Sequence, residues 1–320
     1  MDEFALIRRY FSQLGPRQPE VLEGVGDDCA ALGLAPGEHL LLSIDTSVAD
    51  RHFPAHADPW AIGWRCLAIA LSDLAAVAAR PVGFTLAITL PEADEAWLDA
   101  FSQGLGAMAA QAGCSLIGGD TTLGPLTLSV QVHGAATQHH QWRRRGALAG
   151  DLIAATGPMG LAAAGLQSLL AQPDRAVNRA DWNELERLYM LPRPHLAEAL
   201  RLVSGTNIHA AIDVSDGLLA DLQHLLAASA LGAVLDPQGW PLNETLVDAL
   251  GEEKAREAVM QGGDDYVLLI TFAEDDWPTV RQLCPEAWLV GQCVSGAGMR
   301  TPDGRVLQPR GFNHFARSGT

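Results

Sequence analysis

Acidic residues in this sequence recur where short apolar runs end, and small residues flank nearly every one of them. Six such segments are GDD at 26–28, SIDT at 43–46, SD at 72–73, GGDTT at 118–122, DVSDG at 213–217 and GGDDY at 262–266. Glycines let a backbone turn tightly and approach a ligand, and carboxylates from separate strands can converge on a hard cation. Aspartates without clustered His or Cys favour Mg²⁺ or Mn²⁺ over zinc. The pattern therefore predicts a divalent-metal site.

Each of these acids also has a simpler interpretation. Asp27, Asp28 and Asp120 could close turns or cap helices, and Asp216 could be the N-cap of the apolar helix that follows it. Asp73 is harder to explain in this way, because it lies inside an apolar helical run where an unpaired carboxylate is costly. The simpler interpretation would have to hold in all six segments, so we favour the joint metal site.

The charge composition limits how this protein can hold a phosphate. Its 320 residues include 38 acidic and 21 basic side chains, a formal net charge of −17, and the only lysine is Lys254. The charge argues against a nucleic acid or an anionic membrane as the main partner. A P-loop NTPase or a protein-kinase fold needs a phosphate-binding lysine, and no GxxxxGK[ST] loop is present. A polyphosphate would therefore need several divalent cations to offset the acidic repulsion.

Alternating apolar segments predict the elements that position these acids. We expect strands over 39–45, 84–90, 126–133, 151–156, 208–214 and 266–272, and helices over 60–79, 94–112, after Gly160 and from about Asp216. The run 126–133 alternates apolar and polar residues, as a half-buried strand does. The polar stretch TQHHQWRRR at 137–145 predicts a boundary between two domains, 1–137 and 138–320. Strands of this kind favour two α/β (α+β) domains over a Rossmann sheet or a TIM barrel.

The cysteines and the apolar runs bear on the compartment. Five widely spaced cysteines form no CxxC pair, so we expect neither a zinc site nor a disulfide framework, and most should be buried. The apolar run 60–79 contains Arg65 and Asp73, which makes a membrane span expensive. The N-terminus lacks the features of a signal peptide. We expect a cytoplasmic protein with no membrane partner.

Taken in order, the motifs resemble those of thiamine-monophosphate kinases, which belong to the aminoimidazole ribonucleotide synthetase-like superfamily. They are GVGDDCA, the S-x-D-T…HF element, SDLAAVAARP, GGDTT, R-x-GA-x-x-GD, TG-x-x-G-x-AAAGL, IDVSDGLLADL, GGDDY and GFNHF. The match covers about residues 24–315. The resemblance implies a two-domain fold of mixed sheets with packed helices, an N-terminal domain that binds metal and ATP and dimerises, and a C-terminal domain that completes the active site. It also implies ATP- and Mg²⁺-dependent phosphorylation of thiamine monophosphate to thiamine diphosphate by a homodimer.

The resemblance assigns roles to particular residues. It implies metal ligands at Asp28 (with Asp27 as the adjacent candidate), Ser43, Ile44 through its backbone, Asp45, Asp73, Asp120, Asp213 and Asp216. It implies ATP contacts at Gly119, Asp120, Arg144 and Ser215, and thiamine phosphate contacts at His52, Asp264 and Phe312. Asp45, Asp73, Asp120 and Arg144 are the expected catalytic residues. The family's usual GGEDYEL reads GGDDYVL here, and Phe312 replaces its usual tryptophan.

The expected mechanism needs no general base. A phosphate monoester has a second pKa of about 6, so the acceptor is already mostly an anion near neutral pH. We expect direct in-line transfer between metal-bridged phosphates, with Arg144 gripping phosphate in a bidentate way. The alternatives are another ATP-dependent synthetase of the same superfamily, a metal-dependent phosphohydrolase, and a non-catalytic protein that binds divalent ions.

Overall fold

The structure is a computed structural model, and it describes residues 3–310. The chain forms two compact units, and neither is a single continuous segment. The first unit combines Met1–Gln141 with Ser168–Leu200, and the second combines Trp142–Gln167 with Arg201–Thr320. Helices α4 (Leu161–Ala171) and α6 (Leu196–Gly205) carry the chain from one unit into the other.

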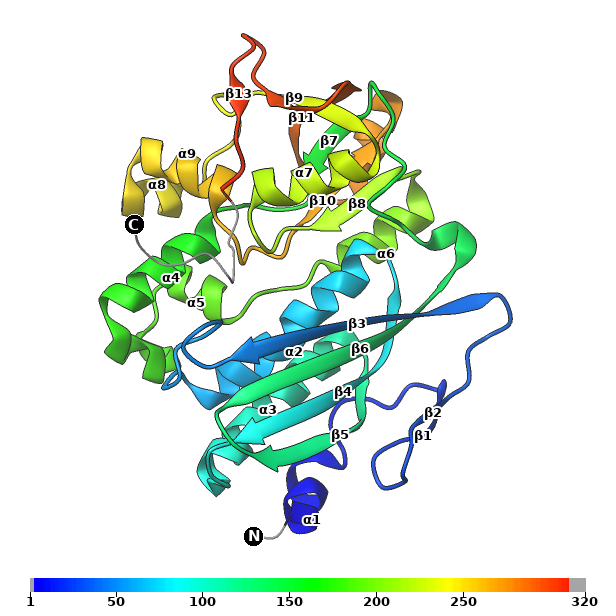
Figure 1. Cartoon of the computed structure of the whole chain (residues 1–320), viewed down its shortest axis with the longest axis vertical. Coiled ribbons are helices and arrows are strands. Elements are labelled where there is room, and N and C mark those ends of the chain that lie inside the picture. Colours follow the sequence, from blue (N-terminus) through cyan, green and yellow to red (C-terminus); the bar gives the residue numbers. More distant parts are fainter. Residues whose placement is uncertain (1–2, 311–320) are drawn as a thin grey trace. The chain divides into compact units, whose positions relative to one another are not determined.

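A four-stranded mixed sheet forms the centre of the first unit (Figure 1). Its strand order is β3 (Glu38–Val48), β6 (Thr127–Thr137), β4 (Arg80–Leu90) and β5 (Ser115–Leu123). Strands β4 and β5 are parallel and the other two pairs are antiparallel. The preceding segment contains α1 (Glu3–Leu6), the π-helix η1 (Ile7–Phe11), and a two-stranded sheet of β1 (Val21–Glu23) and β2 (Ala31–Leu32).

Two long helices, α2 (Pro59–Ala76) and α3 (Glu95–Ala112), cover one face of this sheet. The side chains of Asp58 and Asp94 cap their N-termini by accepting backbone N–H groups, which satisfies donors that the first helical turn leaves open. On β6, Leu128, Val130 and Val132 are fully or almost fully buried against the helices. The predicted alternation of strand 126–133 is thereby confirmed.

The segment Ser168–Leu200 completes the first unit through a buried carboxylate. It contains η3 (Pro173–Val177), η4 (Arg179–Asp181) and α5 (Glu184–Met190). Glu186 has no exposed surface and accepts hydrogen bonds from the Ser168 hydroxyl at 2.6 Å and from Arg175 Nε at 3.1 Å. The same side chain closes a capping box with Asn183 at the start of α5. One buried carboxylate therefore holds the end of α4, η3 and α5 together.

A seven-stranded mixed sheet forms the core of the second unit. Its strand order is β13 (Val306–Leu307), β12 (Gly298–Arg300), β9 (Leu231–Leu235), β11 (Trp288–Ser295), β7 (Leu152–Ala155), β10 (Leu268–Phe272) and β8 (Ala210–Asp213). Its other elements are α7 (Leu218–Ala228), α8 (Glu244–Leu250), α9 (Glu252–Gln261), η5 (Glu274–Asp276) and α10 (Trp277–Leu283). All five residues of β10 are buried, as expected for an interior strand that pairs with β7 on one side and β8 on the other.

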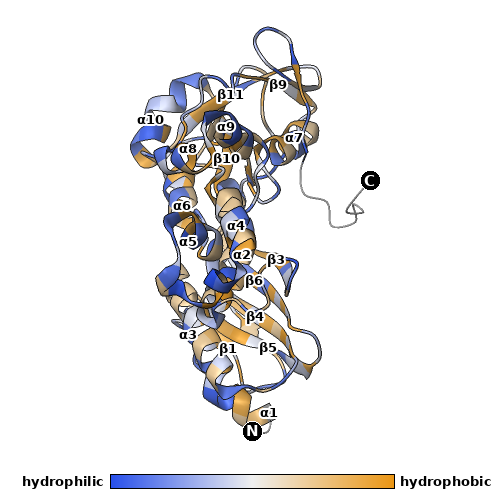
Figure 2. Cartoon of the chain, turned by 90° about the vertical axis from the view of Figure 1, so that its left-hand side faces the viewer, coloured by the Kyte–Doolittle hydropathy of each residue, from blue (hydrophilic) through white to orange (hydrophobic). Residues whose placement is uncertain are grey.

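The structure confirms the predicted strands and helices, with ends that differ by a few residues. Strand β4 and helix α2 are largely hydrophobic, whereas α9, which carries the exposed Lys254, is largely hydrophilic (Figure 2). Four cysteines are buried and Cys29 is exposed, and all five are free thiols. No helix within residues 3–310 combines the length and apolarity that a membrane crossing requires.

Candidate functional site

Three predicted metal ligands come together in the first unit, where β3 faces α2. Asp45 lies opposite Val130 on β6, which in turn lies opposite Leu86 on β4, and both of these apolar residues are buried beneath the helices. Registered cross-strand partners point to the same side of a sheet, so Asp45 faces α2. Asp73 on α2 accepts a hydrogen bond from the Ser43 hydroxyl at 2.5 Å. We call Ser43, Asp45 and Asp73 the β3–α2 acidic group.

Electrostatics within the β3–α2 acidic group favour a cation. Burial and, to a smaller extent, the nearby Asp73 carboxylate together raise the pKa of the Asp45 carboxyl to about 6. Two carboxylates in a partly desolvated place repel each other until a proton or a metal ion offsets their charge. The donors are all oxygen atoms, which suits Mg²⁺ better than a softer metal. The residues present therefore fit a magnesium ion.

Asp120 and Ile44 lie on the opposite side of the same sheet. Asp120 pairs with Ala87, which pairs with Ser129, which pairs with Thr46, and the Thr46 and Ser129 hydroxyls are 2.8 Å apart. Asp120 is exposed in this row, and the side chain of Ile44 on the same face is 61% exposed. Asp120 therefore does not share a face with Asp45 in this chain, and its predicted metal and ATP contacts stay a prediction.

Gly119, a predicted ATP contact, lies on β5 opposite Leu86 of β4. A Cβ atom built on Gly119 would lie 2.0 Å from the Leu86 carbonyl oxygen, a distance that real Cβ atoms do not show. Only glycine fits this position, so the GGDTT segment needs its second glycine for packing as well as for any ligand.

The other predicted ligands of the first unit, Asp27 and Asp28, are exposed between β1 and β2. The Asp28 backbone N–H donates to Asp27 Oδ1 at 2.7 Å. This contact belongs to a local turn, and metal binding by Asp28 or by the adjacent Asp27 stays a prediction.

His52, a predicted substrate contact, is held at two points. Its Nδ1 accepts the Val48 backbone N–H at 3.0 Å, so the proton of the neutral ring lies on Nε2. Its carbonyl oxygen accepts the Tyr189 hydroxyl at 3.0 Å. The buried Arg65 guanidinium lies 4.2 Å from the centre of the Tyr189 ring and donates to the Tyr189 carbonyl. Tyr189 and Arg65 thus support His52, a role that sequence reasoning missed.

In the second unit, the DVSDG segment forms a turn around one buried carboxylate. Asp213 ends β8 and is buried, and Ser215 and Asp216 follow it. One oxygen of Asp221, Oδ2, accepts the backbone N–H groups of residues 215, 216 and 217 at 3.0–3.1 Å. Burial raises the pKa of Asp221 to about 6, although the N–H donors oppose that rise. Asp221 was not among the predicted site residues.

The GGDDY segment lies directly against this turn. The Asp264 N–H donates to the Ser215 carbonyl at 2.9 Å and the Tyr266 N–H donates to the Val214 carbonyl at 2.8 Å. A Cβ atom on Gly263 would lie 2.3 Å from the Ser215 carbonyl oxygen, which requires glycine there. The backbone therefore brings the predicted ATP contact Ser215 and the predicted substrate contact Asp264 into one cluster, the 213–217/262–266 cluster.

Asp265 is the second carboxylate that sequence reasoning missed. Its two oxygens accept the backbone N–H groups of Gly160 at 2.6 Å and Ala162 at 3.3 Å, at the start of α4. Desolvation of the carboxyl raises its pKa to about 7, although these N–H donors oppose the rise. Both Asp221 and Asp265 are visible in the sequence as acids within the singled-out motifs. Their inward direction, however, depends on turns that the sequence does not reveal.

Arg144, the predicted phosphate grip, lies in an exposed segment of the second unit. The neighbouring Arg143 carbonyl accepts the Ala211 N–H at 3.0 Å, which places the arginine triplet beside strand β8. The turn that begins at Asp213 follows this strand directly. Arg144 therefore belongs to the same unit as Ser215, and its phosphate contact stays a prediction.

The predicted ligands thus fall into separate groups. Ser43, Asp45 and Asp73 meet in the first unit, and Asp213 and Asp216 lie in the second. Among residues 3–310, no three His, Cys, Asp or Glu side chains gather closely enough to hold a metal ion by themselves. Phe312, the predicted aromatic contact, lies outside the described residues.

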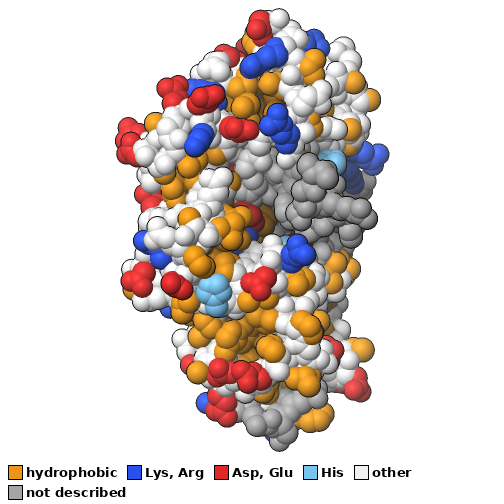
Figure 3. Space-filling view, turned by 60° about the vertical axis from the view of Figure 1, so that its left-hand side comes forward, with side chains coloured by type: hydrophobic (Ala, Val, Ile, Leu, Met, Phe, Trp, Pro, Cys, Tyr) orange, Lys and Arg blue, Asp and Glu red, His pale blue; other side chains and the backbone are white. Residues whose placement is uncertain are grey.

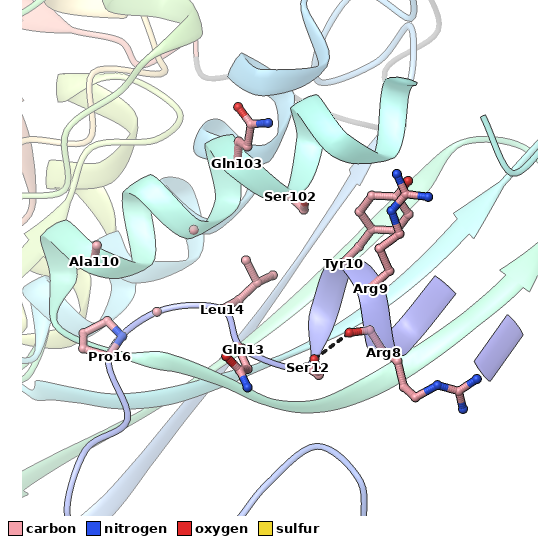
Figure 4. A pocket seen from close by; sticks show the side chains of 12 residues that line it. Arg8, Arg9, Tyr10, Ser12, Gln13, Leu14, Pro16, Ser102, Gln103 and Ala110 are labelled. Carbon is pink, nitrogen blue, oxygen red and sulfur yellow. Dashed lines mark hydrogen bonds between the residues drawn. The ribbon is translucent and has the colours of Figure 1, made fainter. Parts of the chain in front are cut away.

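A cavity of about 860 Å³ also lies in the first unit, between residues 8–16 and α3 (Figure 4). Leu14 points toward α3, whereas the Arg8 side chain extends away from the helix. Arg9, on its rim, forms an ion pair with Glu95 at 2.9 Å. None of the predicted site residues lines this cavity, so it is separate from the predicted chemistry.

Charged side chains on the face drawn in Figure 3 are dispersed. Acidic side chains lie at several separate places, and basic ones are interspersed among them. Part of the net charge of −17 therefore comes from ordinary solvated side chains at the surface. The carboxylates with a chemical role are expected in the small β3–α2 acidic group.

Two family models cover most of the chain. The AIR synthase related protein N-terminal domain matches residues 26–136, and the C-terminal domain of the same name matches residues 149–302. Fold and site together define an AIR synthase related protein.

Curated relatives and solved structures narrow the assignment. The chain is 40% identical to thiamine-monophosphate kinase of Salmonella typhimurium over 85% of this chain and 83% of that protein. It is 32% identical to the Haemophilus influenzae enzyme of the same name over 99% of both. The crystal structure of thiamine-monophosphate kinase from Stenotrophomonas maltophilia matches with a TM-score of 0.83 and 39% identity, covering 91% of this chain and 93% of that one. AaThiL complexed with AMPPCP and TMP matches with a TM-score of 0.78 and 25% identity, covering 89% and 90%. The chain belongs to the thiamine-monophosphate kinase family.

Proposed function

We propose that this chain transfers a phosphoryl group from ATP to thiamine monophosphate and so makes thiamine diphosphate and ADP. The observation that carries the proposal is the β3–α2 acidic group, Ser43, Asp45 and Asp73, in a chain of this family. Relatives that carry the name thiamine-monophosphate kinase, and a structural neighbour complexed with AMPPCP and TMP, support the choice of both substrates.

We assign Mg²⁺ to this activity because oxygen ligands dominate the predicted site. Ser43, Asp45 and Asp73 would hold one ion, and Asp27 or Asp28, Asp120, the Ile44 backbone, Asp213 and Asp216 are the proposed ligands of further ions. When bound, Mg²⁺ supplies the positive charge that offsets repulsion between the phosphates of donor and acceptor. The raised pKa of Asp45 supports a cation beside it, since removing that repulsion is what a cation would do.

The chain's own residues bind and orient the two substrates. We assign ATP contacts to Gly119, Asp120, Arg144 and Ser215, with Arg144 offering a planar fork of donors to a phosphate. We assign thiamine phosphate contacts to His52, Asp264 and Phe312. The acceptor phosphate has a second pKa of about 6 and needs no general base, so alignment for in-line transfer is the main task of the site.

We propose that the functional domains are 1–137, for metal and ATP binding and dimerisation, and 138–320, which completes the active site.

The face of the first sheet opposite α2 supports a homodimer. Leu40, Leu42 and Ile44 of β3 expose 43%, 53% and 61% of their surface there. An apolar row of this kind is typical of a surface that another protein covers. We further propose a cytoplasmic location.

The decisive test incubates the purified chain with ATP, Mg²⁺ and thiamine monophosphate and follows thiamine diphosphate and ADP together. Equal yields of both support the kinase. ADP with free phosphate and no thiamine diphosphate would identify a phosphohydrolase, and no nucleotide turnover would favour a non-catalytic binding protein. ATP consumption only with another acceptor would indicate a synthetase of the same superfamily.

Asp73→Asn tests the metal assignment within the same assay. We expect kcat to fall by at least about 100-fold, since the variant keeps the acceptor of the Ser43 hydrogen bond but loses the charge. The matched control is Asp248→Asn, which changes an exposed carboxylate on α8. Near wild-type turnover of Asp73→Asn at saturating Mg²⁺ would remove Asp73 from the site.

A further inference from the structure

Asp265 lies at the centre of an unusual turn. The residues on either side of it, Asp264 and Tyr266, have φ angles of 67° and 51°. This left-handed region is one that non-glycine residues rarely adopt, and a bulky aromatic residue there is a clear outlier. Such a conformation persists only where the surrounding structure holds it.

Backbone and side chain hold the turn from two directions. The N–H groups of Asp264 and Tyr266 donate to the carbonyls of Ser215 and Val214, which anchors the turn to the DVSDG segment. The Asp265 carboxylate points the other way and accepts the N–H groups of Gly160 and Ala162 at the start of α4. Without that carboxylate, the turn keeps its anchor on one side only.

The orientation of Asp264 depends on this arrangement. Its Oδ1 accepts a hydrogen bond from the Tyr266 hydroxyl at 3.0 Å, and this contact is made across the turn that Asp265 centres. Both oxygens of Asp265 are engaged by backbone N–H groups, so this side chain is not the one that reaches a substrate. The Asp265 carboxylate therefore binds the start of α4, whereas the Asp264 carboxylate binds the Tyr266 hydroxyl.

We propose that Asp265 is a positioning residue, which fixes the 264–266 turn against the start of α4 and so presents Asp264 to the acceptor substrate. This inference rests on the proposed function, in which Asp264 contacts thiamine phosphate. The role also explains how a GGDDY segment with the shorter Asp at 264 works, because a short side chain tolerates little displacement of its backbone.

A double-mutant cycle tests the proposal. Asp265→Ala is expected to raise KM for thiamine monophosphate by about 10-fold, with kcat and KM for ATP within about 3-fold of wild type. In an Asp264→Ala background the further change Asp265→Ala should leave that KM unaltered, since Asp265 acts through Asp264. Tyr266→Phe, which removes only the hydroxyl bonded to Asp264, should raise the same KM by a smaller factor.

A matched control separates positioning from a loss of stability. Asp151 is a buried carboxylate of the same unit that accepts the Leu148 N–H and contacts His209 Nδ1, both at 2.8 Å. Asp151→Asn should lower the unfolding midpoint without changing the KM for thiamine monophosphate. A Asp265→Ala variant that changes both KM values and kcat alike, or that adds its full effect to Asp264→Ala, would overturn the proposal.

Amide hydrogen exchange provides a readout that does not depend on turnover. The Asp265→Asn variant, which retains the shape of the side chain, should exchange faster than wild type at residues 264–266 and 160–162, and not across β10. Unchanged exchange at both segments would overturn the role of Asp265 even if Asp265→Ala fails to fold. Absence of wild-type turnover would refute the proposed function alone, because the exchange result is read from the unliganded chain.

Discussion

Replacing Asp45 with Asn should stabilise the folded chain at pH 8 while it removes a proposed metal ligand. In the structure, burial and the nearby Asp73 carboxylate raise the pKa of Asp45 to about 6 from its ordinary value of 3.8. The folded chain therefore binds this proton more tightly than the unfolded chain does. Stability of the wild type falls as the pH rises from about 4 to about 6, and it stays at the lower level above pH 6.

The size of the effect follows from the two pKa values. A difference between about 6 and 3.8 corresponds to about 3 kcal/mol in the free energy of unfolding at pH 8. Asn cannot ionise, so Asp45→Asn avoids this cost and should be more stable than wild type by up to about 3 kcal/mol at pH 8. The advantage should shrink as the pH falls through the interval between 6 and 4.

Urea denaturation at pH 5 and pH 8, in the presence of EDTA, measures the difference directly. Asp248→Asn is the control, because this exposed carboxylate should change stability by no more than about 0.5 kcal/mol at either pH. Repeating the pH 8 series with Mg²⁺ should stabilise the wild type and leave Asp45→Asn nearly unchanged, since a ligand stabilises only the state that binds it.

Equal or lower stability of Asp45→Asn at pH 8 without Mg²⁺ would refute the electrostatic reasoning. Equal stabilisation of both proteins by Mg²⁺ would refute a metal site that depends on Asp45. The two results are independent. The stability without Mg²⁺ reports on repulsion within the β3–α2 acidic group, and the stabilisation by Mg²⁺ reports on metal binding there.

Two further predictions concern the supports of the first unit. Tyr189→Phe removes the hydroxyl that donates to the His52 carbonyl, and it should lower stability by about 1 kcal/mol in urea denaturation and raise KM for thiamine monophosphate. An unchanged KM would show that the Tyr189 hydroxyl does not contribute to the function of His52. Glu186→Gln should cost about 3 kcal/mol in the same assay, because it leaves Arg175 without its buried charged partner. A loss below 1 kcal/mol would contradict the central role of Glu186.

The predicted elements depended on periodicity, and most of the fold follows from them. The alternation over 126–133 correctly assigned Leu128, Val130 and Val132 to the buried face of β6. The apolar run 60–79 correctly predicts helix α2. Its one aspartate, the half-buried Asp73, accepts the Ser43 hydroxyl, and metal binding by Asp73 stays a prediction. Local sequence patterns indicate on which face of a strand or helix a side chain lies. That information is enough to predict these features.

The contacts that the sequence could not predict depend on turns and on distant segments. Asp221 and Asp265 lie within recognised motifs, but only the turns around them show that both carboxylates bind backbone N–H groups instead of facing outward. The contact of Tyr189 with His52 joins residues 137 positions apart. The face of Asp120 relative to Asp45 is fixed by the register of three strand pairs across four strands, which spacing in one strand does not define.

The discontinuous first unit has a consequence for how the protein is made. Its central sheet is complete in sequence once residue 137 has been synthesised, but Tyr189 and Glu186 belong to a segment that ends at residue 200. The ribosome must therefore synthesise the chain as far as Tyr189, including residues 142–167 of the other unit, before the Arg65 guanidinium can contact the Tyr189 ring. Nascent domains fold as units once all their segments have been synthesised. Until the segment that ends at residue 200 is available, α2 therefore lacks part of its cover.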